Sequence, residues 1–436
     1  MIRAEAGVDR MGGRFDSNGI LPIQSMTVMY TANRLGLALG LSLMILAGCD
    51  SANLTETELD TSDLSDPSLT SFEADESLDL ASADKYGHGR HVRAGMVFTM
   101  SDAADGNQVL AYGRAANGRI TSSHAFETGG LGSGDGLNGT THPLILSPDS
   151  RYLYAVNAGS NTVSIFRRIG RNLRLLGTVP SGGTRPSSIT THGNLVYVVN
   201  VGGSEPANIT GFRMYGGHLR QVVTRPVSAG AADLPQIDFS PDGRYLVVTD
   251  KATNTITTYV VDRRGIAGDP STFASAGQTP FGFDIRWDNT LFVSEAVGGA
   301  PDASSASTYK IRRDGSLEVI SAAVPTTETA ACWADLTANG RFGYVTNGGS
   351  GTLSGYRMDR RGNIELLNAD GETVSTGDGS TPLDLDIVGN SLLYVHTKGT
   401  NGIQGFRIDQ RDGSLTPISG GDISGLPSTT VGVIAF

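Results

Sequence analysis

A strand pattern recurs along the chain after residue 94. Each unit begins with a short apolar strand, which leads through a turn into a second strand rich in Tyr and Val. A loop of Gly, Ser, Asn and Thr follows, then a third strand such as "TVSIFRR" (162–168), another turn and a last strand. These short apolar runs between turn residues predict β-strands, and no long stretch after residue 50 shows the 3.6-residue apolar period of a helix.

The second strand of each unit gives a clear register. Its last residue is Ser101, Asn157, Asn200, Asp250, Glu295, Asn347 or Thr397 in the seven copies. Neighbouring copies are 43 to 56 residues apart. Four strands in a unit of this length are typical of a β-propeller blade. The sequence therefore predicts an all-β, seven-bladed β-propeller with four-stranded antiparallel blades.

The two ends of the repeat region predict how the ring closes. The first unit lacks an obvious innermost strand before Met96, whereas the chain ends in "VGVIAF" (431–436), which is similar to the innermost strands of other units. An open array of blades would expose two long edges, and closure removes them. We expect residues 431–436 to pair beside residues 96–101 and complete blade 1.

An export signal is predicted within residues 1–49. Arg34 precedes an apolar run that has the length of a signal-peptide core and is too short to span a membrane. The run ends in "LAGC" (46–49), which resembles the lipobox of bacterial lipoproteins; a buried helix that ends in Cys is the alternative. We expect a start at Met26 or Met29, lipidation of Cys49 and a membrane-anchored lipoprotein in the periplasm or on the cell surface.

Residues 50–93 are predicted to be a disordered acidic linker to the propeller (94–436). Residues 50–84 contain eleven Asp or Glu and no Lys or Arg, too much one-sided charge for a packed core. Of the formal charge of −11, only about −1 falls on residues 85–436, which argues against nucleic-acid binding. His88 and His91 in the linker are expected to be solvated rather than metal ligands.

The repeats resemble those of the seven-bladed propeller lactonase family, which includes bacterial 6-phosphogluconolactonases and fungal carboxymuconate cyclases. The resemblance covers about residues 94–436, with segments such as "NAGSNTVSIFR" and "TDKATNTITTY", and residues 344–347 spell the YVTN repeat. It implies a lactonase-like hydrolase or a lactone-forming cyclase. Such chemistry needs a polarised carbonyl, a positioned water or carboxylate, and a group that moves a proton.

One blade departs from the family pattern. In the family an Arg and a His begin an innermost strand, and a Glu ends the strand that follows. The stretch "LPQIDFSPDGRYLVVTDK" (234–251) aligns with that blade without gaps, and the three positions hold Pro235, Gln236 and Lys251. The cation and both acid/base groups are therefore replaced there.

Other blades offer polar groups at the same rim. His142 falls in the rim column of blade 2 and resembles a rim histidine that serves as acid/base in the cyclase branch, Arg185 enters the innermost strand of blade 3, and Glu295 ends a second strand of blade 5. We predict that these three catalytic candidates converge on one rim pocket. The predicted ligand-binding residues are Gln236, Asp250, Lys251 and Trp333.

Each candidate also has a structural interpretation. The residues that end the second strands, Asp250 among them, often cap loops through side-chain hydrogen bonds. His142 could bond to a neighbouring blade, Arg185 and Glu295 could pair with each other or with Lys251, and Trp333 could pack in the core.

Cysteine and metal chemistry are not expected at the propeller. Cys332 is predicted to be a packed thiol, and its only possible disulfide partner, Cys49, has another expected fate. No cluster has metal-ligand spacing, and "DLD" (384–386) is too sparse for a calcium loop, so neither a metal nor a cofactor is predicted.

Two functions stay open. The first is an exported, lipid-anchored enzyme that acts on a small sugar or carboxylic lactone. The alternative is a non-catalytic cell-surface propeller that binds a glycan, peptidoglycan or a protein of the cell envelope. The replaced family residues, the anchor and the long linker favour the second, and a monomer is expected in either case.

Overall fold

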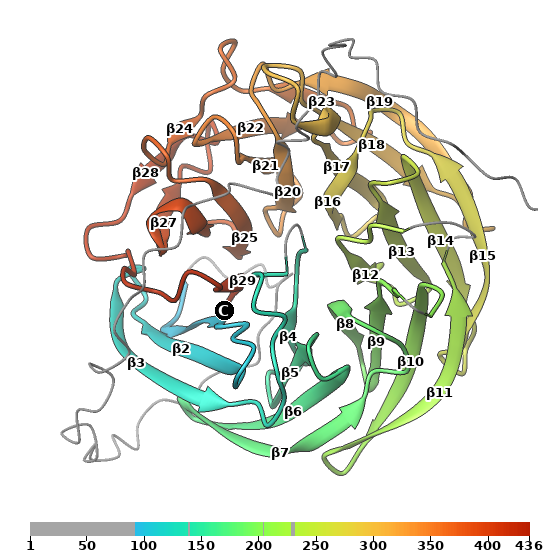
Figure 1. The fold of residues 1–436 in the computed structure, drawn as a ribbon. Helices are drawn as coiled ribbons and strands as arrows, with labels where there is room; N and C mark the ends of the chain where they lie inside the picture. Colours follow the sequence, from blue (N-terminus) through green and yellow to red (C-terminus); the bar gives the residue numbers. More distant parts are fainter. Residues whose placement is uncertain (1–91, 138–139, 204, 228–231) are drawn as a thin grey trace, which may run out of the picture. The chain divides into compact units, whose positions relative to one another are not determined.

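A computed structural model of the chain describes residues 92–137, 140–203, 205–227 and 232–436. The predicted leader, Cys49, His88 and His91 lie outside these residues. The described residues form seven antiparallel sheets arranged as blades around a central axis (Figure 1). This arrangement confirms the predicted all-β, seven-bladed propeller. None of the helices in the described part of the chain is long and apolar enough to cross a membrane.

The blades follow one another along the chain, and each of blades 2 to 7 runs from its innermost to its outermost strand. Blade 1 contains β1 (Gly95–Met100), β2 (Gln108–Arg114), β3 (Ile120–Glu127) and the C-terminal β29 (Val431–Ala435). Blade 2 contains β4 (Leu144–Leu146), β5 (Tyr152–Asn157), β6 (Thr162–Ile169) and β7 (Asn172–Pro180). Blade 3 contains β8 (Pro186–His192), β9 (Leu195–Asn200), β10 (Asn208–Tyr215) and β11 (His218–Pro226). Blade 4 contains β12 (Ile237–Phe239), β13 (Tyr245–Asp250), β14 (Thr255–Val261) and β15 (Ala267–Ala274).

The last three blades follow the same plan. Blade 5 contains β16 (Pro280–Ile285), β17 (Thr290–Glu295), β18 (Ser305–Ile311) and β19 (Leu317–Pro325). Blade 6 contains β20 (Ala331–Leu336), β21 (Phe342–Asn347), β22 (Thr352–Met358) and β23 (Ile364–Leu366), and the short β24 (Val374–Ser375) also pairs with β22. Blade 7 contains β25 (Pro382–Val388), β26 (Leu392–Thr397), β27 (Gly402–Ile408) and β28 (Leu415–Pro417). Two 3-10 turns, η3 (Val297–Gly299) and η4 (Lys398–Thr400), follow β17 and β26.

The ring closes as the sequence predicts. The C-terminal β29 is the innermost strand of blade 1 and pairs antiparallel with β1, with Phe98 opposite Ile434 and Met100 opposite Val431. The guanidinium of Arg114, only 1% exposed, donates to the carbonyl oxygen of Phe436 at 2.5 Å. Both ends of the repeat region are therefore joined in one sheet.

The burial of the second strands explains why the repeat can be recognised in the sequence. A blade packs against a neighbour on each face, so β9, β13, β17, β21 and β26 are buried along their whole length. Outer strands such as β3 instead alternate between half-buried and exposed positions. Six of the seven second strands end at the predicted residue. The seventh, β1, ends at Met100 because Ser101 begins the turn, where its hydroxyl accepts the N–H of Gln108.

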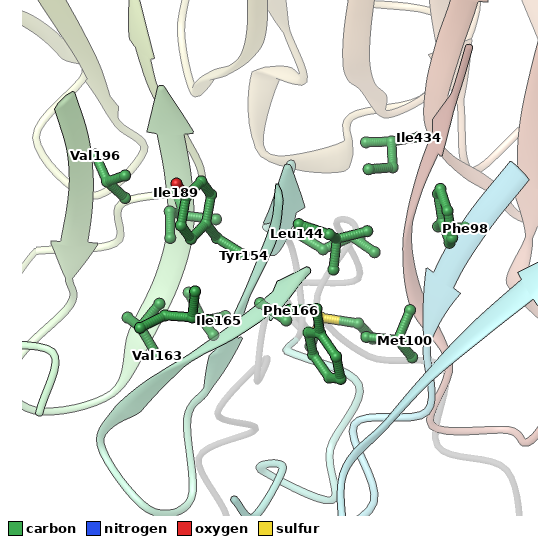
Figure 2. Close-up of a cluster of buried hydrophobic side chains, with 14 of the residues drawn as sticks. Phe98, Met100, Leu144, Tyr154, Val163, Ile165, Phe166, Ile189, Val196 and Ile434 are labelled. Atoms are coloured by element: carbon green, nitrogen blue, oxygen red, sulfur yellow. The ribbon is translucent and has the colours of Figure 1, made fainter. Parts of the chain in front are cut away.

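Apolar side chains fill the spaces between blades. Figure 2 shows the cluster shared by blades 1, 2 and 3, in which Phe98, Leu144, Phe166 and Ile189 are each at most 2% exposed. Each such side chain contributes roughly 1.5–3 kcal/mol on burial. The turn of blade 4 shows how closely the blades approach each other. Gly243 there has φ +68°, and a Cβ at this position would lie 2.3 Å from the His192 ring of blade 3.

Candidate functional site

Residues 140–142 precede β4 and contact the innermost strands of several blades; we call them the crossing segment, and we call the end of the ring where they lie the mouth. Trp333 of blade 6 donates its indole N–H to the carbonyl oxygen of Thr140 at 3.0 Å. The N–H of Thr141 donates to the carbonyl oxygen of Pro235 in blade 4 at 2.8 Å. Figure 1 shows the chain that leads into β4 near the centre of the ring. Blades that are not sequence neighbours are thus joined through this segment.

His142 is the titratable member of the crossing segment. It is half-buried and has a positive φ of 50°. Its N–H donates to Oδ2 of Asp384 in blade 7 at 3.2 Å, and its carbonyl oxygen accepts the N–H of Ile189 in blade 3 at 3.0 Å. Its ring Nδ1 lies 3.4 Å from Nε2 of Gln236 in blade 4. The backbone of His142 is therefore held by blades 3 and 7, and its ring contacts blade 4.

Gln236 is placed beside this histidine and away from solvent. The side chain is 1% exposed, and its amide forms a paired contact with the backbone of Phe283 in blade 5. Nε2 donates to the Phe283 carbonyl oxygen at 2.7 Å, and Oε1 accepts the Phe283 N–H at 2.8 Å. Gln236, one of the predicted ligand-binding residues, is therefore buried and contacts the ring of His142.

Trp333 and Lys251 form an aromatic and cationic group next to the crossing segment. The ring of Trp333 is 2% exposed and packs 4.9 Å from the ring of Phe281. The ammonium of Lys251 lies 4.3 Å from the centroid of Phe281 and 3.1 Å from Oδ2 of Asp233, and its side chain is 4% exposed. A cation held over an aromatic face with a carboxylate partner is stable in such a site.

Asp384 is a residue of the mouth that the sequence did not single out as part of the site. Its fully buried carboxylate accepts the N–H of His142 and, at 3.3 Å, that of Val433 in β29. Burial raises the pKa of Asp384 well above its usual value, and the nearby charge of Asp386 adds to the rise. This side chain connects the candidate histidine to the strand that closes the ring.

Arg185 and Glu295 have different contact partners from those of His142. Arg185 is exposed, and its guanidinium pairs with Asp135 at 2.7 Å. Glu295 is fully buried, and its carboxylate accepts the N–H of Gly277 at 2.8 Å and the hydroxyl of Ser305 at 2.5 Å. Burial raises the pKa of Glu295, and the hydroxyl and N–H donors partly oppose the rise. Each of the three predicted catalytic residues thus has its own set of partners.

Glu295 belongs to a column of capping residues. Asn157 and Asn347 end the second strands of blades 2 and 6, and each donates to two hydroxyl groups at the start of the next strand. Asp250 ends the second strand of blade 4, and its Oδ1 accepts the N–H of Asp233 at 3.1 Å and of Ala252 at 3.0 Å. These contacts correspond to the capping interpretation of the strand ends.

Carboxylates cover the free edges of the innermost strands. Asp284, Asp335 and Asp386 each accept two N–H groups, one from the residue that follows and one from the innermost strand of the next blade. In blade 6, for example, Oδ2 of Asp335 accepts the N–H of Ile387 at 2.8 Å. We call this row the ladder column, and its members in blades 3 to 7 are Thr190, Asp238, Asp284, Asp335 and Asp386.

The positions two residues before the ladder column lie closer to the mouth, and we call them the mouth column. In blades 3 to 7 its members are Ser188, Gln236, Gly282, Trp333 and Asp384. Ser188 and Gln236 also accept an N–H from the next innermost strand. Gly282 has no side chain because blade 6 approaches it closely; a Cβ there would lie 2.7 Å from Cα of Trp333. The candidate site is therefore built from the mouth column and the crossing segment.

The described residues contain no group of three or more His, Cys, Asp and Glu side chains placed to hold a metal ion. Cys332 is fully buried in an apolar cluster with Phe281 and Trp333. Its sulfur is disulfide-bonded, so the prediction of a packed free thiol at this position is wrong. The candidate chemistry at the mouth therefore consists of an imidazole, a buried amide, a buried carboxyl and an aromatic wall.

The fold defines a seven-bladed β-propeller with a polar site at one mouth of its channel. No protein-family model matches the sequence, and no curated protein matches it significantly. Solved structures do share the fold. One is described as a candidate 6-phosphogluconolactonase of Bacteroides fragilis, with a TM-score of 0.60, 20% identity, and coverage of 78% of this chain and 98% of that one. Another is the periplasmic gluconolactonase of Pseudomonas aeruginosa, with a TM-score of 0.62, 16% identity, and coverage of 78% and 99%. At these identities the likeness establishes the seven-bladed propeller fold.

Proposed function

We propose that this protein is an exported propeller that opens or forms a small sugar or carboxylic lactone at the channel mouth. The observation that carries the proposal is the position of His142, half-buried at the mouth and fixed from several blades. The structural likeness to a protein described as a periplasmic gluconolactonase supports the lactone as substrate class. Arg185 and Glu295 have no assigned step in this proposal, because their contacts lie elsewhere.

The proposed hydrolysis consumes one water. The water oxygen adds to the lactone carbonyl carbon, the ring C–O bond breaks, and the ring oxygen takes up the proton that the water loses, so a hydroxy acid forms. Negative charge develops on the carbonyl oxygen during the addition, and a hydrogen-bond donor aimed at that oxygen lowers the barrier. His142 is the proposed donor, and Trp333 and Lys251 form the wall behind it.

Turnover of a panel of sugar and carboxylic lactones by the purified protein tests this proposal. We expect His142→Ala to lower kcat/KM by about 100-fold or more, the range typical of a lost oxyanion donor. His218→Ala is the matched control, since His218 is exposed at the start of the outermost strand of blade 3 and should leave turnover unchanged. Turnover that survives His142→Ala would move the chemistry elsewhere.

A second candidate is a non-catalytic propeller that binds a glycan or an envelope protein. The observation that favours it is the crossing segment, because Thr140 and Thr141 occupy part of the mouth with their own backbone contacts. Pro235 at the position of the family's Arg and Lys251 at the position of its Glu also favour this function. A protein that turns over none of the lactones but is retained by purified peptidoglycan or on a glycan array would establish this function.

Lipid anchoring at Cys49 is a further part of the proposal and is supported by the sequence "LAGC" (46–49). We expect the wild-type protein to sediment with membranes and to incorporate a labelled fatty acid. Cys49→Ala should abolish the label. Retention of the label in that variant would contradict the assignment.

A further inference from the structure

The orientation of the Gln236 amide is determined by its neighbours. Phe283 offers it one donor and one acceptor from the same residue, at 2.8 Å and 2.7 Å. Only the orientation with Oε1 on the N–H and Nε2 on the carbonyl oxygen satisfies both, because a flipped amide would face donor to donor and acceptor to acceptor. The nitrogen atom is therefore the one that lies 3.4 Å from Nδ1 of His142.

A primary amide nitrogen carries two hydrogens and accepts no hydrogen bond. One hydrogen of Gln236 Nε2 is used by the carbonyl of Phe283, and the second is available to the imidazole. Nδ1 of His142 must accept this hydrogen bond, because a protonated Nδ1 would point its own hydrogen at the N–H of Gln236. We infer that Gln236 holds neutral His142 in the tautomer that carries its proton on Nε2.

Backbone contacts keep the imidazole in register for this role. The N–H of His142 is bound by Asp384 and its carbonyl oxygen by the N–H of Ile189, which fixes the residue at its unusual positive φ. Gln236 is itself 1% exposed, and its amide contacts the ring of His142. Gln236 is thus a positioning residue, and the ligand-binding role predicted for it acts through the histidine.

The consequence for chemistry rests on the proposed function. A neutral His142 with its proton on Nε2 presents a donor to a ligand at that nitrogen, so it binds an oxygen that carries or gains negative charge. A lactone carbonyl oxygen is such a group. The same tautomer is unsuited to remove a proton from water at Nε2, so His142 acts by polarising the carbonyl rather than as the base.

Nitrogen-15 NMR of the intact protein labelled at histidine tests the tautomer without any substrate. The spectrum is recorded at about pH 8, above the ordinary histidine pKa of ~6.5, and His142→Ala assigns the resonance. We expect the wild-type His142 to show a protonated Nε2 and an unprotonated Nδ1. Gln236→Glu replaces the donor by a carboxylate acceptor, and we expect the proton to appear on Nδ1.

Gln404→Glu is the matched control, because Gln404 is a half-buried glutamine whose Nε2 donates to the carbonyl of Thr376 in a different part of the ring. It should leave the His142 signals unchanged. A wild-type proton on Nδ1, or an Nε2–H that survives Gln236→Glu in a folded protein, would overturn the inference. If Gln236→Glu does not fold, the wild-type spectrum alone decides. Because no turnover enters this measurement, an inactive protein with the expected tautomer would contradict the proposed function and leave the inference standing.

Discussion

Two columns of side chains lie on the same innermost strands, two residues apart, and they differ in kind. The ladder column repeats one solution, a carboxylate that covers N–H groups of its own strand and of the next blade, in blades 5, 6 and 7. The mouth column meets the same backbone with a different residue in every blade from Ser188 to Asp384. The repeated carboxylates of the ladder column therefore mark contacts that the ring needs in order to close. The varied residues of the mouth column mark where the candidate site is built.

The crossing segment makes the second column different. Trp333 and Asp384 hold Thr140 and His142, and Gln236 contacts the imidazole. The crossing segment occurs once in the ring, so a side chain that contacts it has no equivalent partner in the other blades. The ladder column covers N–H groups of its own strand and of the next innermost strand, which are similar in each blade, so one residue type recurs in blades 5, 6 and 7.

The largest expected effect comes from breaking the ladder column. Asp335→Leu leaves the N–H of Ile387 without its carboxylate in a buried site, and we expect a loss of about 2–4 kcal/mol in the free energy of unfolding. Urea denaturation measures it. Asp335→Asn keeps one carbonyl acceptor and should cost less. A loss below about 1 kcal/mol for Asp335→Leu would show that the carboxylate is not what satisfies this edge.

The next effect is the pH dependence of the free energy of unfolding, to which two buried groups of blade 7, His396 and Asp384, contribute with opposite signs. Burial lowers the pKa of His396 to about 3, with a smaller contribution from the charge of Lys398. Between pH 6.5 and 3 the unfolded chain binds a proton at this residue and the folded chain does not, so acidification destabilises the fold through His396. We expect stability relative to His396→Val to fall by about 1.4 kcal/mol for each pH unit below ~6. Parallel pH profiles of the two proteins would contradict this.

The mouth column should show the opposite sign at Asp384. Its raised pKa means that the folded chain keeps a proton which the unfolded chain releases above about pH 4, so acidification stabilises the fold through this group. Relative to Asp384→Asn, the wild-type protein should gain stability as the pH falls towards 4. Urea midpoints of both proteins over this range measure the difference, and a relative loss would reverse the assignment.

A smaller effect is expected when the crossing segment loses one anchor. Trp333→Phe keeps an aromatic ring against Phe281 and removes the donor to Thr140. We expect a loss of about 1 kcal/mol in unfolding free energy and a fall in the lactone turnover that depends on His142. Trp287→Phe is the control, because Trp287 is 61% exposed. Equal turnover in both variants would mean that the crossing segment does not position the site.

The smallest effect is expected at Glu295, where the amide oxygen of a glutamine can accept the N–H of Gly277 and its NH2 group can donate to the hydroxyl of Ser305. Glu295→Gln should change the unfolding free energy by less than about 1 kcal/mol and should not change turnover. Turnover that falls at least tenfold in this variant would return Glu295 to the catalytic set with His142.

The sequence predicts the fold well because the determining contacts repeat. Each second strand is buried on both faces by like neighbours, so the Tyr and Val runs, their spacing and the strand ends could be read one blade at a time. The site is different, since its contacts join distant residues. His142 and Asp384 are 242 positions apart, and nothing local in "DLD" (384–386) indicates an N–H that comes from across the ring. The column of His142 was predictable, but its partners were not.

The position of β29 as the last strand has a consequence for how the chain is made. Blade 1 receives its innermost strand only when residues 431–435 become available, whereas each later blade is continuous in sequence. A growing chain can therefore assemble blades one after another but holds an unfinished first blade until residues 431–435 have been made. Completion of the ring therefore waits for the synthesis of β29, and the N–H groups of Val433 and Ala435, which donate to Asp384 and Asp386, arrive with it.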